Sequence, residues 1–205
     1  MKTLEKYTSE EREDFAKELA EKIRKEFAVE TTEEGTVYKS ELQHTKFRCL
    51  YTDEEMLDIC RCAFELIEKL KEKIDNGVTG ESLEEDVRAN SPDGHVDPDS
   101  TPLGVLSRMH ALMDQDMWKL YFDTAKTVRV GGAYLMLMSG PMFQSAIYSS
   151  FDVMLRYVNE QPPYIEDPEL YTAYFLARAA MKMHSEEIKE TELEKEDEGK
   201  TKSEN

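Results

Sequence analysis

Cysteine is scarce in this 205-residue sequence, which holds only Cys49, Cys60 and Cys62. An odd and sparse set of thiols does not make the disulfide framework of a small secreted protein. The first residues also lack the apolar run that a signal peptide needs. A chain of this length can bury about 70% of its unfolded surface without disulfides or a structural metal. We therefore expect a cytoplasmic protein with reduced thiols.

Positive charge is also in short supply, because 26 Lys and Arg stand against 44 Asp and Glu, for a net charge of −18. Residues 77–101 hold seven acids with Arg88 as their single base, and residues 185–205 hold nine acids against four bases. Residues 102–184 are nearly neutral. A chain without a basic stripe is poorly suited to binding nucleic acid or anionic lipid directly. The charge instead predicts a protein partner with a basic surface.

Familiar catalytic motifs are missing as well, including the nucleophile elbow, the phosphate-binding glycine loop and the dinucleotide fingerprint. Glu41 and His44 have the spacing used in di-iron bundles, but those sites need the motif twice. The alternating acids around His95 do not follow the EF-hand pattern. We therefore predict no catalytic residue, no metal site and no cofactor.

Two further residue sets have a chemical and a structural interpretation. His110 with Asp114 one helical turn later could form an acid–base pair. A histidine near an apolar helical face is more often a hydrogen-bonded core or interface residue, which is the interpretation we favour for His110 and His184. Cys60 and Cys62 point to different faces of a helix, so Cys60 should lie in the core and Cys62 outside it.

Two capping boxes mark helices in the N-terminal half. Thr8 with Glu11 predicts a helix over about 9–29, and Thr52 with Glu55 predicts one over 53–75. The first helix has a narrow apolar stripe of Phe15, Leu19, Ile23 and Phe27. The second has a broad stripe of Met56, Cys60, Ala63, Phe64, Ile67, Leu70 and Ile74. The segment between them is either a small β-hairpin near 36–51 or an ordered loop.

Glycine and proline gather in residues 77–102, which predicts an acidic flexible loop over 77–101 with room for a short helix at about 82–89. This segment is either an excursion within one domain or a joint. We expect one helical domain over 1–190, with 1–76 and 102–190 as the alternative division. The acidic tail over 191–205 is expected to be disordered.

The C-terminal half is apolar and rich in methionine. Pro102 suits the first position of a helix whose face would include Leu103, Leu106, Met109, Met113 and Met117. No charged residue lies between Arg129 and Asp152, but Gly140 and Pro141 favour two buried helices meeting there over a membrane span. Asp167 and Pro168 open a last helix with a coiled-coil-like seam of Leu170, Tyr174, Ala177, Met181, His184 and Ile188.

These patterns predict a mostly α fold, an irregular bundle of five to six helices with a small hairpin. We expect a non-enzymatic acidic protein that binds a basic partner surface, such as an inhibitor of a nucleic-acid-handling complex of the anti-CRISPR kind made by phages. Charge alone motivates that identity. The predicted binding residues are Glu10, Glu11, Glu13, Asp14, Glu18, Glu21, Asp93, Asp97 and Asp99.

Two alternatives remain open at this stage. The first is a structural or oligomeric helical protein that dimerises through residues 102–184, because methionine and aromatic residues are enriched at interfaces. The second is a metal-dependent helical-bundle enzyme that uses Glu41, His44 or His110.

Overall fold

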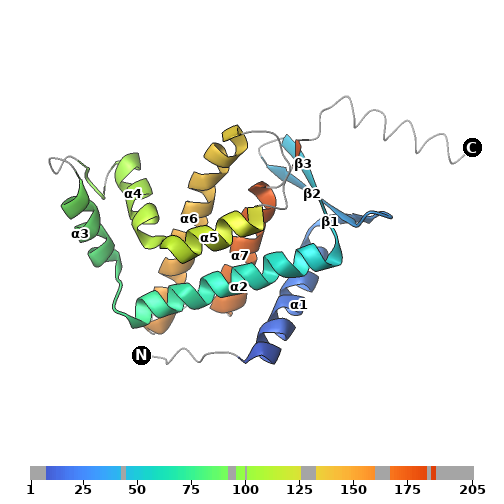
Figure 1. Ribbon diagram of the computed structural model, residues 1–205, viewed down its shortest axis with the longest axis horizontal. Coiled ribbons are helices and arrows are strands. Elements are labelled where there is room, and N and C mark those ends of the chain that lie inside the picture. Colours follow the sequence, from blue (N-terminus) through green and yellow to red (C-terminus); the bar gives the residue numbers. More distant parts are fainter. Residues whose placement is uncertain are drawn as a thin grey trace, which may run out of the picture.

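The computed structural model describes residues 8–42, 45–91, 96–99, 101–125, 133–159, 167–183 and 186–187. The fold is mostly α, as predicted, and the described residues contain seven helices and one small antiparallel sheet (Figure 1). The helices are α1 (Ser9–Glu26), α2 (Asp53–Asp75), α3 (Gly80–Asn90), α4 (Pro102–Leu112), α5 (Gln115–Ala125), α6 (Ala133–Val158) and α7 (Pro168–Met183). The strands are β1 (Ala28–Thr31), β2 (Thr36–Leu42), β3 (Thr45–Tyr51) and β4 (Glu186–Glu187), in the order β1-β2-β3-β4.

The long helix α2 is the centre of the fold and packs against α1, α5, α6 and α7. Its predicted bounds and capping box are confirmed, because the Thr52 hydroxyl accepts from the Glu55 N–H at 3.2 Å and the Glu55 carboxylate accepts from the Thr52 N–H at 2.8 Å. Every member of its predicted apolar stripe is buried. Buried residues of α1, α2, α5, α6, α7 and the sheet belong to one contiguous cluster.

Helix α1 begins as predicted but ends at Glu26, so the predicted extension to residue 29 is wrong. The backbone turns extended at Phe27, and Ala28–Thr31 pairs with β2 as strand β1. Gly35 allows the tight return, because its φ is +150° and an added Cβ would lie 2.6 Å from the Tyr51 carbonyl oxygen. Local strand pairing therefore replaces the last helical turn.

The predicted hairpin is confirmed as β2 and β3, which pair from Thr36 opposite Tyr51 to Leu42 opposite Thr45. The inner face of the hairpin buries Tyr38, Cys49 and Tyr51. Cys49 and Tyr51 are two residues apart on β3, and Tyr38 lies opposite Cys49 on β2, so alternation of side chains places all three on one face.

The prediction that two helices meet at Gly140 and Pro141 is wrong, because α6 is one continuous helix from Ala133 to Val158. A proline inside a helix removes one backbone hydrogen bond but does not by itself reverse the chain. The turns after it are anchored by buried Ile147, Phe151 and Met154, which favours continuation. No helix in the described part of the chain is long and apolar enough to cross a membrane.

The last helix begins at Pro168 as predicted, and Asp167 caps it by accepting from the Leu170 N–H at 3.0 Å. Its predicted seam is buried at Tyr174, Ala177 and Met181. The extension of the seam through Ile188 is wrong at residues 186–187, which pair with β3 as strand β4. His184, Ile188 and the predicted disordered tail at 191–205 lie outside the described residues.

A side-chain hydrogen bond ties α7 to the end of α1. The Tyr174 hydroxyl donates to the Glu26 carboxylate at 2.6 Å. Partial burial and then this hydrogen bond raise the pKa of Tyr174 to about 12. The same hydrogen bond is the main cause that lowers the pKa of Glu26.

We expect Tyr174→Phe to lower the free energy of unfolding by about 1–2 kcal/mol at neutral pH, since it removes a hydrogen bond to a charged group. A tyrosine whose pKa is raised on folding contributes fully below its unfolded pKa of about 10. The difference between wild type and variant should therefore stay constant up to that pH and shrink as the pH rises towards 12. Urea unfolding of both proteins across this range measures it, and a difference that does not shrink there would contradict the assignment.

Candidate functional site: a groove over helix α4

The groove is built by two short helices, α3 and α4, that lie at one end of the molecule (Figure 1). Both begin at a threonine cap: the Thr79 hydroxyl accepts from the Ser82 N–H, and the Thr101 hydroxyl accepts from the Gly104 N–H. Helix α3 packs on α4, and α4 packs on α6. The prediction of a flexible loop over 77–101 is therefore wrong for Gly80–Asn90, and the short helix allowed there is confirmed and longer than expected.

A cluster of ion pairs fixes α3 against α4. Arg108 donates to Glu84 at 2.8 Å and lies 3.9 Å from Asp99, while Arg88 lies 3.5 Å from Asp99 and 3.9 Å from Glu84. The Arg108 guanidinium also stacks over the Tyr148 ring of α6 at 5.6 Å. Arg88 and Arg108 are therefore both paired with acids of this cluster, Glu84 and Asp99.

The segment between the two helices is held at both ends. Ser91 accepts from the Val96 N–H at 3.2 Å, and the Asp97 carbonyl accepts from the Thr101 hydroxyl at 2.8 Å. Pro98 is buried and its neighbour Asp97 packs directly on Gly104 of α4. The wall of the groove formed at Val96 is therefore fixed by contacts on both sides.

Glycine at position 104 permits this close approach, because an added Cβ would lie 2.0 Å from the Asp97 carbonyl oxygen and 2.7 Å from the Pro98 Cα. We expect Gly104→Ala to lower the free energy of unfolding by about 1–3 kcal/mol, because backbone atoms must move to make room. Gly80→Ala is the matched control, since a Cβ there meets nothing within 4 Å. Thermal unfolding by circular dichroism compares the two, and equal stability of both variants would contradict the close contact.

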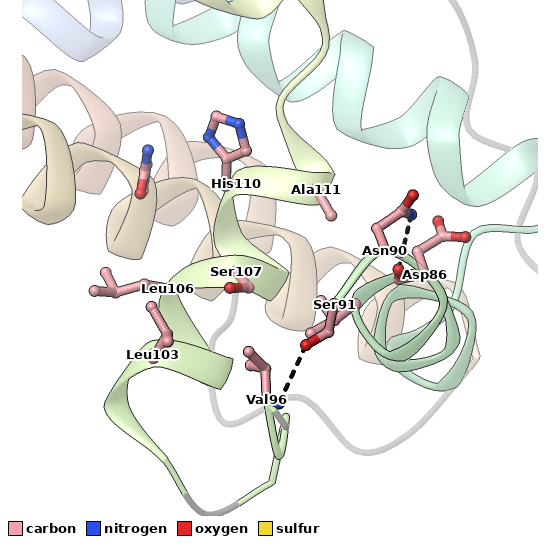
Figure 2. Close-up of a pocket in the computed structure, with 11 residues that line it drawn as sticks. Asp86, Asn90, Ser91, Val96, Leu103, Leu106, Ser107, His110 and Ala111 are labelled. Atoms are coloured by element: carbon pink, nitrogen blue, oxygen red, sulfur yellow. Dashed lines mark hydrogen bonds between the residues drawn. The ribbon is translucent and has the colours of Figure 1, made fainter. Parts of the chain in front are cut away.

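The groove has a volume of about 580 Å³, within the range of ligand-binding pockets. Figure 2 shows its residues along α4, with the end of α3 and Val96 beside them. The lining residues are Asp86, Val87, Asn90, Ser91, Val96, Leu103, Leu106, Ser107, His110, Ala111 and Gln144.

Two leucines at the groove are exposed: Leu103 retains 60% of its accessible surface and Leu106 retains 38%. The sequence predicts both leucines on one apolar face with Met109, Met113 and Met117. These methionines are buried, but the two leucines are not. The buried face instead runs through Gly104, Met109 and Leu112. Among the lining residues that the structure describes there is no Lys or Arg, and Asp86 is the one carboxylate. The site is thus apolar at its base with a negative charge at its rim.

His110 is exposed at the groove and packs against Trp118, with ring centroids 5.6 Å apart. His110 therefore does not lie in the core, and its place at an interface stays a prediction. Its predicted partner Asp114 is engaged elsewhere, because the Asp114 carboxylate accepts from Lys73 at 2.8 Å and from the Met117 N–H at 2.9 Å. Burial opposes these bonds, but together they lower the pKa of Asp114.

Asp114 also explains why the predicted single face from Leu103 to Met117 is divided between two helices. Its side chain caps α5, so α4 ends at Leu112 and a new helix begins at Gln115. An aspartate followed three residues later by an apolar residue is the signal that could have located this break.

The predicted acids of α1 divide into two groups. Glu11 closes the capping box with Thr8, and Glu13 accepts from Arg61 of α2 at 2.9 and 3.0 Å. The remaining four lie at spacings of three and four on the exposed side, a set we call the α1 ridge: Glu10, Asp14, Glu18 and Glu21. Asp14 lies 3.8 Å from Lys17 and Glu21 lies 3.7 Å from Lys25, so two members of the ridge are locally paired.

The predicted loop acids are not free binding groups in the described residues. The Asp97 side chain accepts from the Asp99 N–H at 3.0 Å, and Asp99 belongs to the ion-pair cluster with Arg88 and Arg108. Asp93 and His95 lie outside the described residues.

The structure removes the helical premise of the di-iron interpretation, because Glu41 lies in strand β2 opposite Lys46. His44 lies outside the described residues. Within the described ranges, no group of three or more His, Cys, Asp or Glu side chains could hold a metal ion. Cys60 is a core residue, as predicted, and burial raises the pKa of its thiol to about 12. Cys62 is partly exposed, with Sγ 3.9 Å from the Leu120 carbonyl oxygen.

Comparison with protein-family models, with curated proteins and with solved structures gave no match. The function is therefore argued from the geometry and charge of the described residues.

Proposed function

We propose that this chain is a non-enzymatic binding protein whose acidic helices engage a basic surface on a protein partner. The observation that carries this proposal is the charge of α3, which has four acids against Arg88 alone. Arg88 is already engaged by Glu84 and Asp99. Three carboxylates of α3, namely Glu81, Glu85 and Asp86, have no ion pair among the described residues.

Helix α1, which carries the ridge, lies near the opposite end of α2 from α3 (Figure 1) and provides a second acidic surface. Like charges spaced four residues apart destabilise a helix by a few tenths of a kcal/mol, as at Glu10, Asp14 and Glu18. Part of this cost is offset by the position of Glu10 in the first turn and by the Asp14–Lys17 ion pair, so the ridge is the weaker candidate for binding. Lysines and arginines also lie between the acids of α1, so the negative electrostatic potential at this ridge is weaker than that at α3.

Many other acids of the ordered helices hold the fold together. Arg61 alone is bonded to Glu13, Glu54 and Asp58, and these hydrogen bonds raise the pKa of Arg61. Arg24 donates to Asp53 at 2.8 Å. The acids of the α1–α2 contact are therefore poor candidates for a partner, and the unpaired acids of α3 are better ones.

The finer proposal is that the partner belongs to a nucleic-acid-handling complex and that binding inhibits it in the cytoplasm. Its support is that nucleic-acid channels present the basic surfaces that a carboxylate-rich helix would complement. Cys49, Cys60 and Cys62 form no disulfide in the described part of the chain, which is consistent with a reducing compartment.

The experiment is capture of partners from lysate by immobilised protein at low salt, with quantitative mass spectrometry of what each salt step elutes. Two charge-matched variants locate the surface: Glu81→Gln/Glu85→Gln removes two charges from α3, and Glu10→Gln/Glu18→Gln removes two from α1. We expect the α3 variant to release the partner at lower salt, with a smaller effect for the α1 variant. Retention that is independent of salt and of both substitutions would overturn the proposal. Competition by added DNA or RNA tests the finer proposal.

A second candidate function, self-association, is favoured by an exposed face on α7. Tyr171 and Phe175 are large exposed apolar residues one turn apart, and exposed Arg178 continues the face while stacking over the Phe27 ring at 5.6 Å. Aromatic residues and arginine are enriched at protein interfaces. Light scattering after size exclusion gives the mass, and a dimer that Tyr171→Ser/Phe175→Ser dissociates would establish this candidate.

A further inference from the structure

The floor of the groove has the spacing of a helix-binding surface. Leu103, Leu106, Ser107, His110 and Ala111 lie on one side of α4 at steps of three and four residues. From residue 103 to residue 111 this side extends for about 12 Å, since a helix rises 1.5 Å per residue. That length matches about two turns of a second helix, which would present two or three apolar side chains.

The sides of the groove come from different elements and carry polar residues beside the apolar Val87 and Val96. Asn90 and Ser91 lie at the end of α3, while Gln144 comes from α6. Asn90 donates its amide to the Asp86 carbonyl at 2.8 Å, and Ser91 accepts from Val96, so these side chains are held in place (Figure 2). An apolar base with a polar rim is the usual composition of a specific interface.

The charge around the groove selects the kind of occupant. Asp86 lines it, and Glu81 and Glu85 lie on the same helix without an ion pair among the described residues. The nearby cations Arg88 and Arg108 are both occupied by Glu84 and Asp99. The electrostatic field at the groove is therefore negative, which favours lysine or arginine on the occupant.

We infer that the groove over α4 binds a basic amphipathic helix of the partner protein. The apolar face of that helix packs on Leu103, Leu106 and Ala111. Its lysines or arginines face Asp86 and the two other acids of α3, Glu81 and Glu85. This is the helix-in-groove mode of recognition, read by anchors at i, i+3 or i+4, and i+7. The inference rests on the proposed function and adds to it a site and a class of ligand.

The test uses a fluorescent synthetic peptide with leucines at i, i+3 and i+7 and lysines elsewhere, with binding followed by anisotropy. We expect Leu103→Ser/Leu106→Ser to weaken binding at least about tenfold, since buried apolar anchors dominate such interfaces. Asp86→Asn should weaken it about threefold at low salt, through loss of one charge attraction. A peptide with glutamate in place of lysine should not bind.

Matched controls distinguish peptide binding at the groove from non-specific binding to other acidic or exposed apolar residues. Leu50→Ser removes an exposed leucine of β3, which retains 45% of its surface. Glu18→Gln removes an exposed acid of the α1 ridge that has no ion pair among the described residues. Both controls should bind the peptide like the wild type. Equal loss in the Leu50 control, or no loss in the double groove variant, would overturn the inference. Circular dichroism confirms that each variant is folded.

Two outcomes distinguish failure of this inference from failure of the proposed function. If Glu81→Gln/Glu85→Gln weakens partner capture while the double groove variant does not, the groove is not the site and the proposed function stands. If capture is independent of salt and charge, the proposed function fails whatever the peptide does. A dimer of the wild type that the double groove variant dissociates would make a second copy the occupant and would also overturn the inference.

Discussion

Replacing Lys71 with methionine should lower the free energy of unfolding by about 3–5 kcal/mol, because it leaves a buried carboxylate without its counter-charge. Lys71 lies on α2 with its side chain only 6% exposed, and it forms an ion pair with Glu169 in the first turn of α7, whose side chain is 13% exposed. Urea denaturation followed by circular dichroism measures the effect.

Two companion variants make this expectation specific to the buried pair. Adding Glu169→Gln to Lys71→Met should recover much of the loss, because the uncompensated charge is then gone. Lys25→Met, which removes a surface partner of Glu21 on α1, should change stability by no more than about 0.5 kcal/mol. A loss below about 1 kcal/mol in the Lys71 variant would show that Glu169 finds water or another partner there.

Phe64→Ala should also cost about 3–5 kcal/mol, through lost burial and the cavity that remains. Phe64 lies on α2 and is 1% exposed, and its ring is 4.7 Å from the ring of Phe15 on α1. The substitution therefore loosens the contact between the two N-terminal helices as well as the core. Urea denaturation gives the change in unfolding free energy and shows from its slope whether the transition remains cooperative.

The matched control for Phe64 is Phe175→Ala on α7, where the side chain is exposed. We expect that variant to lose less than about 1 kcal/mol, because little apolar surface returns to water. Similar losses at both positions would contradict the placement of Phe64 in the core.

Helix α2 could be predicted from sequence in full, because its capping box and apolar period agree and nothing competes with them. The end of α1 could not, since the strand pairing of Val29 with Tyr38 overrides the helical pattern. The continuity of α6 through Pro141 was missed for a similar reason, because packing of later turns outweighs a local signal. Long-range contacts decide such positions, and one sequence does not display them.

The groove could not be predicted from the sequence, because the residue types of α4 do not show which face of this helix is buried. The buried face of this helix includes Gly104 and the largely buried ion-pairing Arg108, and neither residue carries a hydrophobic signal. The leucines that do carry it, Leu103 and Leu106, are exposed. A binding role of the predicted acids stays a prediction, and the ion pairs that engage Glu13 and Asp99 could not be read from the sequence because they depend on distant partners.

Helix α3 makes its main contacts with α4 and buries only Leu83 and Val87. A helix attached in this way can open while the body around α2 stays folded, since local opening needs less free energy where few apolar contacts are lost. Glu81, Glu85 and Asp86, which have no ion pair in the described part of the chain, therefore lie on a helix that we expect to open early. A partner that binds α3 in its packed position would stabilise this helix against local opening by its binding free energy. Slower hydrogen exchange of the α3 backbone amides would therefore report that the partner is bound.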